Sequence, residues 1–248
     1  MKIENKEYWE KDAIVATFDK EKTTAGDYEI FMFSQAKERQ AAIRNIENIK
    51  IFGCGAGREV NEAAKYFHPK KMVASDIAEN MIAKCNYNLK VWGIEHITET
   101  ILGSAKDIAV ENNFFDLVVI FDSMLTYVAK RSERMEIFQK SFSILKSKGV
   151  IIGTVHNQEG VWSKTLYFKI RNWFSFLLGE KVGNRNTGSR GFKVDGYYYS
   201  KKGLINDIHE IGFTNIEVYS LSEFYAQINI NYNRKKGYNN LIFIASKP

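Results

Sequence analysis

Short apolar runs alternate with helical segments between residues 49 and 155, and this alternation restricts the fold more than any other feature of the sequence. The expected strands are residues 49–52, 71–75, 99–102, 117–121 and 150–155, and the helices between them are residues 59–66, 78–90 and 133–145. The run at 117–121 is apolar throughout, as burial on both faces of a sheet requires. Strands that alternate with helices form right-handed βαβ units. We therefore predict a doubly wound α/β fold with a mostly parallel sheet.

The pattern changes after residue 156, where an aromatic and basic stretch interrupts the alternation. A helix at 202–211 and strands at 215–219 and 241–245 follow. The segment between these two strands is polar and shows no helical pattern, so we predict an antiparallel hairpin at the edge of a seven-stranded sheet. The expected organisation is an N-terminal helical cap (1–46, with a helix ending near residue 45), an α/β core (47–156), a lid insertion (157–200) and the C-terminal part of the core (201–248).

Composition indicates one globular domain, with or without a lid. The 248 residues are 45% hydrophobic and 26% charged, as is usual for a soluble domain. Cys54 and Cys85 provide no disulfide framework, and the N-terminal sequence MKIENKEYWEKD has no apolar core typical of a signal peptide. No run reaches the roughly 18 apolar residues of a membrane span. We expect a cytoplasmic protein.

The net charge of +6 is concentrated in one segment. Residues 160–202 contain nine basic and two acidic residues, so this segment accounts for the whole excess of positive charge. A local positive field favours an anionic partner, although a solvated surface without a partner would have the same composition.

A glycine turn follows the first expected strand. Gly53-Cys54-Gly55-Ala56-Gly57 stands between that strand and a helix. Glycine lets the backbone bend tightly and approach a ligand, and the helix N-terminus attracts anionic groups. Arg58 replaces the last glycine of the dinucleotide fingerprint, and no Gly-Lys-Ser/Thr follows, so NAD and a P-loop are both disfavoured. A tight turn without a ligand is the structural alternative.

Asp76 ends the second expected strand, about 20 residues after the glycine turn. The carboxyl ends of neighbouring parallel strands lie side by side, so this carboxylate can accept both ribose hydroxyls of a nucleoside. It can also cap the following helix. The two roles are compatible.

These features resemble the class I S-adenosylmethionine-dependent methyltransferases. The glycine turn resembles motif I of that family, and residues 115–123 resemble motif IV. Matches at residues 75–82, 103–108, 145–150 and 211–213 stand in the same order as in the family. The resemblance covers residues 45–155 and implies S-adenosylmethionine as cofactor, with S-adenosylhomocysteine as product.

The resemblance also implies roles for individual residues. Gly53, Cys54 and Gly55 would approach the methionine part of the cofactor. Asp76 would bind the ribose, and Ile77, Ser104 and Ala105 would contact the adenine. Phe121 and Asp122 would lie near the sulfonium, and Tyr28, Tyr8 and Trp9 would close the pocket. The sequence departs from the family at Ile51, where relatives often carry an acid, and at Ser104, where an Asp is common.

His156 is the candidate catalytic base. It follows the fifth strand at the edge where such sheets bind ligands, and its ordinary pKa suits proton transfer near neutrality. Asn157 beside it could orient an acceptor. A loop histidine held by backbone contacts is the alternative. His68, His96 and His209 carry no ligand spacing, so no metal site is indicated.

The insertion indicates a site for the methyl acceptor. Residues 161–178 place Trp162, Leu166, Ile170, Trp173, Phe174 and Leu177 on one face of a helix. We expect this face to pack on the core as a lid, although aromatic and basic residues also suit an interfacial helix. Arg185, Arg190 and Lys193 follow in a glycine-containing stretch and suit a phosphate, nucleotide-sugar or carboxylate.

The sequence therefore favours a small-molecule N- or O-methyltransferase with an anionic acceptor. The motif Asn/Asp-Pro-Pro-Tyr/Phe of amino-methylating DNA enzymes is absent at residues 121–124, and we expect no stable nucleic-acid complex. Two alternatives remain: an RNA or protein methyltransferase that holds a polymer through the basic segment, and a non-catalytic S-adenosylmethionine-binding protein.

Overall fold

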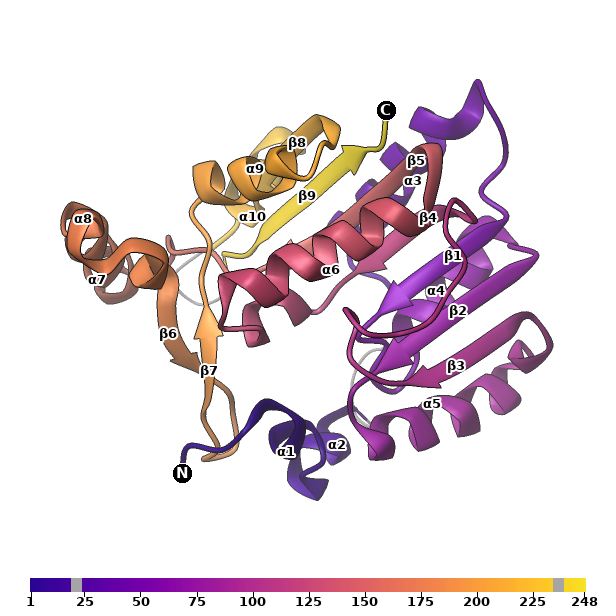
Figure 1. Ribbon diagram of the computed structural model, residues 1–248, viewed down its shortest axis with the longest axis horizontal. Helices are drawn as coiled ribbons and strands as arrows, with labels where there is room; N and C mark the ends of the chain where they lie inside the picture. Colours follow the sequence, from indigo (N-terminus) through magenta and orange to yellow (C-terminus); the bar gives the residue numbers. More distant parts are fainter. Residues whose placement is uncertain (19–23, 234–238) are drawn as a thin grey trace.

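A seven-stranded sheet forms the centre of the computed structural model, which describes residues 1–18, 24–233 and 239–248 (Figure 1). The strand order is β3-β2-β1-β4-β5-β9-β8; β9 runs antiparallel to both neighbours, and the other pairs are parallel. The strands are β1 (Asn48–Phe52), β2 (Lys71–Asp76), β3 (Thr98–Leu102), β4 (Phe115–Ile120), β5 (Leu145–Val155), β8 (Thr214–Ser220) and β9 (Leu241–Ser246). The predicted doubly wound fold with an antiparallel edge hairpin is confirmed.

Helices cover both faces of this sheet because successive strand residues point to opposite sides. Ile49 and Ile51 of β1 pack in one cluster with α3, α4, α5 and α10, whereas Phe52 packs in another with α6 and α9. The helices of the first face are α3 (Asp27–Ala41), α4 (Arg58–Phe67), α5 (Glu79–Trp92) and α10 (Leu221–Gln227); those of the second are α6 (Arg131–Ile144) and α9 (Lys201–Glu210). The carboxyl ends of β1, β2 and β4 stay open to ligands.

Two local predictions were wrong. The segment after β8 contains α10, which begins with a capping box: the Ser220 hydroxyl accepts the Glu223 N–H, and the Glu223 carboxylate accepts the Ser220 N–H. The sequence Ser220-Leu-Ser-Glu223 carries this signal, but the polar composition that follows obscured it. The helix expected to end near residue 45 ends at Ala41.

The N-terminal segment lies against the insertion across the open edge of the sheet (Figure 1). It carries α1 (Asn5–Trp9) and α2 (Asp12–Phe18), and the insertion carries a hairpin of β6 (Asn184–Thr187) and β7 (Val194–Tyr197). The N–H of Ile3 donates to the Lys193 carbonyl, and the N–H of Lys193 donates to the Met1 carbonyl, each at 2.9 Å. Tyr8 adds a hydroxyl contact of 3.1 Å to Ser189. The N-terminal segment and the insertion, which are far apart in the chain, thus form one continuous wall at the open edge of the sheet.

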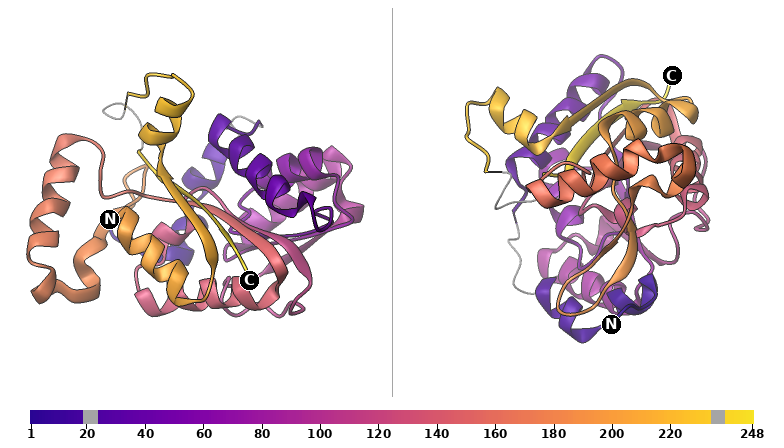
Figure 2. Two further views of the ribbon diagram at one scale, coloured as in Figure 1. Left: turned by 90° about the horizontal axis from the view of Figure 1, so that it is seen from above. Right: turned by 90° about the vertical axis from the view of Figure 1, so that its left-hand side faces the viewer.

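The helical part of the insertion projects from the side of the molecule (Figure 2). It consists of α7 (Trp162–Trp173) and α8 (Ser175–Leu178). The expectation that its apolar face packs on the core is wrong: Trp162 is 76% exposed and Trp173 is 80% exposed. Phe168, on the other side of α7, is the residue that packs inward. None of the described helices is both long and apolar enough to cross a membrane.

Candidate active site

Two adjoining cavities occupy the open edge of the sheet. The smaller has a volume of about 820 Å³ and lies at the ends of β1, β2 and β3; the larger, of about 1200 Å³, lies between the N-terminal segment, the end of β5 and the insertion. Most residues that the sequence assigns to the cofactor line the smaller cavity, namely Gly53, Gly55, Asp76, Ile77, Ser104, Ala105 and Asp122. Trp9, Phe18, Asp122, Tyr127 and Asp195 line both.

The glycine turn forms the floor of the smaller cavity. Gly53 and Gly55 have φ angles of +66° and +49°, which side-chain-bearing residues rarely adopt. A Cβ at Gly53 would lie 2.6 Å from the Cγ of Met124, so the space above the turn has no room for a side chain. The N–H of Cys54 donates to the Ser75 carbonyl at 3.0 Å and fixes the turn beside β2. Both glycines nevertheless line the cavity, so their backbone is part of its surface.

Asp76 faces the same cavity from the end of β2. Its two carboxylate oxygens accept the N–H groups of Gly55 at 2.9 Å and Ala78 at 3.0 Å. Burial raises the pKa of this carboxyl above its ordinary value, while the two N–H groups act in the opposite direction. The carboxylate thus links the glycine turn to the start of α5, as expected for an acid that also caps this helix.

Three of the predicted residues lie elsewhere. The side chains of Cys54 and Phe121 are buried in the core and line neither cavity; Phe121 packs on the ring of Phe33 at 5.6 Å. Contact with Cys85 and burial raise the pKa of the Cys54 thiol. Tyr28 lines the larger cavity rather than the smaller one.

The segment after β4 separates the two cavities. Asp122 and Ser123 both have positive φ angles, +50° and +56°, so the chain turns sharply here. The Thr154 hydroxyl accepts the Ser123 N–H at 2.9 Å, and the Asn240 amide donates to the Ser123 hydroxyl at 3.3 Å. This support holds Asp122 at the boundary between the cavities, and backbone strain of this kind is common at functional sites.

A cluster of charges that the sequence did not reveal lies beside Asp122. Arg58 donates to both oxygens of Glu29 at 2.8 Å, to Glu59 at 2.8 Å and to Asp122 at 3.1 Å. Burial, followed by the charge of Asp122, raises the pKa of Glu59. Three carboxyl groups thus face one guanidinium, so a further cation would be attracted here. The only sign of this charge cluster in the sequence analysis was Arg58, which stands where the dinucleotide fingerprint has its last glycine.

The larger cavity has a basic wall. Four of its lining residues are cationic: Arg171, Lys181, Arg185 and Lys193. The first three come from α7 and the chain that follows it, and Lys193 comes from the turn of the β6–β7 hairpin. Arg190, which was grouped with them from the sequence, does not line this cavity.

His156 lines the larger cavity where β5 ends. The ring of His156 contacts Tyr198 and Tyr127, with centroids at 5.1 Å and 6.2 Å, and the backbone N–H of His156 donates to the Thr126 hydroxyl at 2.8 Å. Burial, and secondarily the charge of Lys164, lowers the pKa of His156 to about 4. Asn157 is buried, accepts the Glu159 N–H at 3.0 Å and lines neither cavity. His156 is therefore neutral at pH 7 and a weak base.

Comparison with known proteins identifies the family. Residues 49–149 match the model of a methyltransferase domain. This part of the chain is a methyltransferase domain, as the resemblance to the class I S-adenosylmethionine-dependent methyltransferases predicts. A search of curated proteins finds no matching sequence. Among the described residues no group of three or more metal-ligating side chains could hold a metal ion.

Solved methyltransferase structures share the fold at low sequence identity. An S-adenosylmethionine-dependent methyltransferase from Methanosarcina mazei is 18% identical, with a TM-score of 0.62 over 84% of this chain and 95% of that one. Phosphoethanolamine N-methyltransferase 2 from Haemonchus contortus is 14% identical, with a TM-score of 0.67 over 99% of this chain and 61% of that one. The N-methyltransferase NodS from Bradyrhizobium japonicum is 13% identical, with a TM-score of 0.55 over 89% of this chain and 97% of that one.

Proposed function

We propose that this methyltransferase transfers a methyl group to a nitrogen or oxygen atom of a small acceptor that carries a phosphate or carboxylate. The acceptor lies in the larger cavity, next to the cofactor in the smaller one. The observation that carries the proposal is the basic wall of the larger cavity, which adjoins the cofactor cavity at Asp122. Arg171 is half-buried and the other three cationic residues are exposed, and such side chains around a cavity attract and orient anionic groups.

Arg185 is the best candidate for the anionic group. Its guanidinium lies 5.6 Å from the Tyr167 ring and 5.8 Å from the Tyr198 ring, and no acidic group of the described residues forms an ion pair with it. A guanidinium offers a planar fork of donors that matches the oxygens of phosphate or carboxylate. Arg171, in contrast, donates to the carbonyls of Lys181 and Val182 and so shapes the wall.

The residues of the smaller cavity fit S-adenosylmethionine. The exposed backbone at Gly53 and Gly55 would hold the methionine part, and the carboxylate of Asp76 would accept the ribose hydroxyls. Ile77, Ser104 and Ala105 would surround the adenine. Asp122, with the surplus of carboxyl groups around Arg58, would attract the ammonium of the methionine part and replace the acid that is absent at Ile51. The cofactor supplies a methyl group on a positively charged sulfur.

His156 would act on the acceptor as a hydrogen-bond acceptor. With its pKa lowered to about 4, the imidazole is neutral at pH 7 but holds a proton weakly. An efficient general base has a pKa near the working pH. We therefore assign His156 the task of orienting the N–H or O–H of the acceptor toward the methyl group.

Two structural neighbours are compatible with this class of acceptor. The Haemonchus contortus enzyme was solved with phosphomonomethylethanolamine and S-adenosylhomocysteine, and the Bradyrhizobium japonicum enzyme is an N-methyltransferase. The first ligand is a small amine with a phosphate. It is the first compound to test.

The test is release of S-adenosylhomocysteine with a panel of small amines and alcohols, each with and without a phosphate or carboxylate. We expect turnover only with the anionic members. Arg185→Ala should raise KM roughly tenfold or more at nearly unchanged kcat, because one charge-assisted contact contributes roughly 1.5–3 kcal/mol. Arg185→Lys should restore part of the affinity, and Lys202→Ala, an exposed residue outside both cavities, serves as control.

Two results would contradict the proposal. Turnover on RNA or protein, with an affinity that falls steeply with salt, would support a polymer acceptor. Tight binding of S-adenosylhomocysteine without turnover on any acceptor would support a non-catalytic binding protein.

A further inference from the structure

The outer face of α7 and α8 is an exposed apolar surface. We define the α7–α8 face by side chains that are all exposed: Trp162, Leu166, Ile170, Trp173, Phe174, Phe176 and Leu177. The four residues of α7 are spaced three or four apart and so lie along one side of that helix, and Phe174, Phe176 and Leu177 follow at its end and in α8. Soluble monomers rarely leave such a group of large apolar side chains in contact with water unless a partner covers it.

The inner side of α7 is fixed to the protein, so the helix cannot rotate to bury the exposed face. Phe168 is 1% exposed and packs on Tyr198 with ring centroids at 5.4 Å. Arg171 donates to the Val182 carbonyl at 2.9 Å, and Asn172 donates to the Gln158 side chain at 2.9 Å. These contacts keep the apolar side of α7 exposed in the folded protein.

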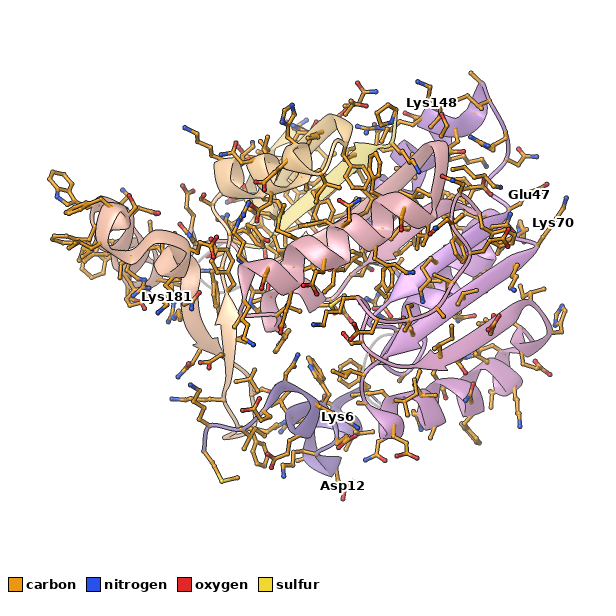
Figure 3. All side chains as sticks on the ribbon, viewed as in Figure 1. Lys6, Asp12, Glu47, Lys70, Lys148 and Lys181 are labelled. Atoms are coloured by element: carbon orange, nitrogen blue, oxygen red, sulfur yellow. The ribbon has the colours of Figure 1, made fainter. Side chains whose placement is uncertain are left out.

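The surroundings of this face are positively charged. Between residues 161 and 185 there are five basic residues and one acidic residue, Glu180, which lies 3.8 Å from Arg131. Arg171 and Arg185 line the larger cavity, so the lysines on and after the helices supply the charge beside the exposed face. Lys169 is exposed on α7, and Lys181 lies just beyond α8 (Figure 3). The partner must therefore be both apolar and anionic. A second copy of the same face fits poorly, because it would bring like charges together.

We propose that the α7–α8 face docks on an anionic lipid bilayer, with its aromatic side chains at the level of the headgroups. Amphipathic helices with tryptophan and phenylalanine on one side and basic residues around them bind such surfaces. Each lysine or arginine near an anionic surface strengthens binding roughly fivefold. Tyr167 of α7 and Lys181, which follows α8, line the larger cavity, so docking of the α7–α8 face brings one wall of that cavity close to the membrane.

The test is flotation of the full chain with vesicles of phosphatidylcholine, alone or with about one third phosphatidylglycerol, at low and high salt. We expect binding to the anionic vesicles that weakens with salt, together with a blue shift of tryptophan fluorescence. Trp173→Ser and Phe176→Ser should each weaken binding roughly tenfold, since each removes a large apolar group from the interface. Lys169→Glu should weaken binding roughly tenfold or more.

Matched controls separate docking from general stickiness. Tyr87→Ser removes an exposed aromatic residue from α5, and Lys148→Glu reverses a charge at the far side of the molecule (Figure 3); neither should change vesicle binding. All variants should keep the affinity for S-adenosylhomocysteine, which shows that they fold. The proposal is overturned if anionic vesicles bind no protein at low salt. It is also overturned if neutral vesicles bind equally well, or if light scattering shows a dimer that Trp173→Ser dissociates.

Discussion

The carboxylate of Asp76 accepts the N–H of Gly55 at 2.9 Å, so two of the residues that the sequence assigned to the cofactor are hydrogen-bonded to each other. The other oxygen of Asp76 accepts the Ala78 N–H at 3.0 Å. Asp76→Asn removes the charge and places an NH₂ group opposite one of these donors. We expect the affinity for S-adenosylhomocysteine to fall roughly 10- to 100-fold, since hydrogen bonds to charged groups contribute about 1.5–3 kcal/mol. Titration calorimetry measures it.

The control for Asp76 is Glu95→Gln, which neutralises an exposed carboxylate outside both cavities. Thermal unfolding of both variants separates loss of binding from loss of fold. Unchanged uptake of the cofactor by Asp76→Asn would show that the nucleoside lies elsewhere.

Neutralising Asp122 should weaken cofactor binding without lowering the stability of the fold. It shares Arg58 with Glu29 and Glu59, and its negative charge raises the pKa of Glu59. Asp122→Asn relieves this repulsion, so the melting temperature should stay the same or rise. The affinity for S-adenosylhomocysteine should fall roughly tenfold, because an ammonium loses a charged partner. Equal affinity in the variant and the wild type would remove Asp122 from the cofactor site.

The core of the fold followed from the sequence because its signals are local. Apolar runs such as residues 117–121 fall in a central strand, and glycines after β1 form the expected turn. The same local signals predicted where Gly53, Asp76 and Ser104 meet, since parallel strands bring their carboxyl ends together. Those residues line one cavity.

The missed features depend on contacts between distant residues. Helical spacing on α7 indicates an apolar face but not whether another element covers it, and here Trp173 stays exposed. Arg58 and Glu29 are 29 residues apart, and only the packing of α3 on α4 brings them together. Phe121 follows the motif of the family, yet its side chain points to Phe33 because a core position was available on that side.

His156 should make the protein sensitive to mild acid. Burial lowers its pKa to about 4 in the folded state, against about 6.5 in the unfolded chain. Between these values the unfolded state binds more protons, so stability falls as the pH decreases from about 6.5 to about 4. The loss attributable to His156 is roughly 3 kcal/mol. Urea unfolding of His156→Asn should show a flatter pH dependence, whereas His96→Asn, an exposed histidine, should match the wild type.

The same pKa sets the acid limb of activity. If neutral His156 orients the acceptor, protonation of this residue should not lower kcat near pH 6.5. Any acid limb of the pH–kcat profile that disappears in His156→Asn should lie near pH 4. A limb at pH 6–7 that the substitution abolishes would instead make His156 a general base with its ordinary pKa.

Lys50 is a buried charge whose removal should stabilise the protein. It lies in β1 with no exposed surface, its ammonium donates to the Ser75 hydroxyl at 2.8 Å, and burial lowers its pKa to about 7. The unfolded chain holds this proton up to about pH 10.4, so wild-type stability attributable to Lys50 rises with pH between about 7 and 10.4. Lys50→Met fills a similar volume without the charge, and we expect it to add roughly 3 kcal/mol near pH 6.5.

The pH dependence decides whether the buried charge is the cause. The stability difference between Lys50→Met and the wild type should be largest below pH 7 and should shrink as Lys50 loses its proton in the folded state. Urea unfolding at pH 6.5, 8 and 9.5 measures this, with Lys90→Met on the exposed side of α5 as control for an added apolar side chain. A gain that is independent of pH would mean that methionine packs better than lysine and that Lys50 keeps its proton in the folded protein, as in the unfolded chain, throughout this range.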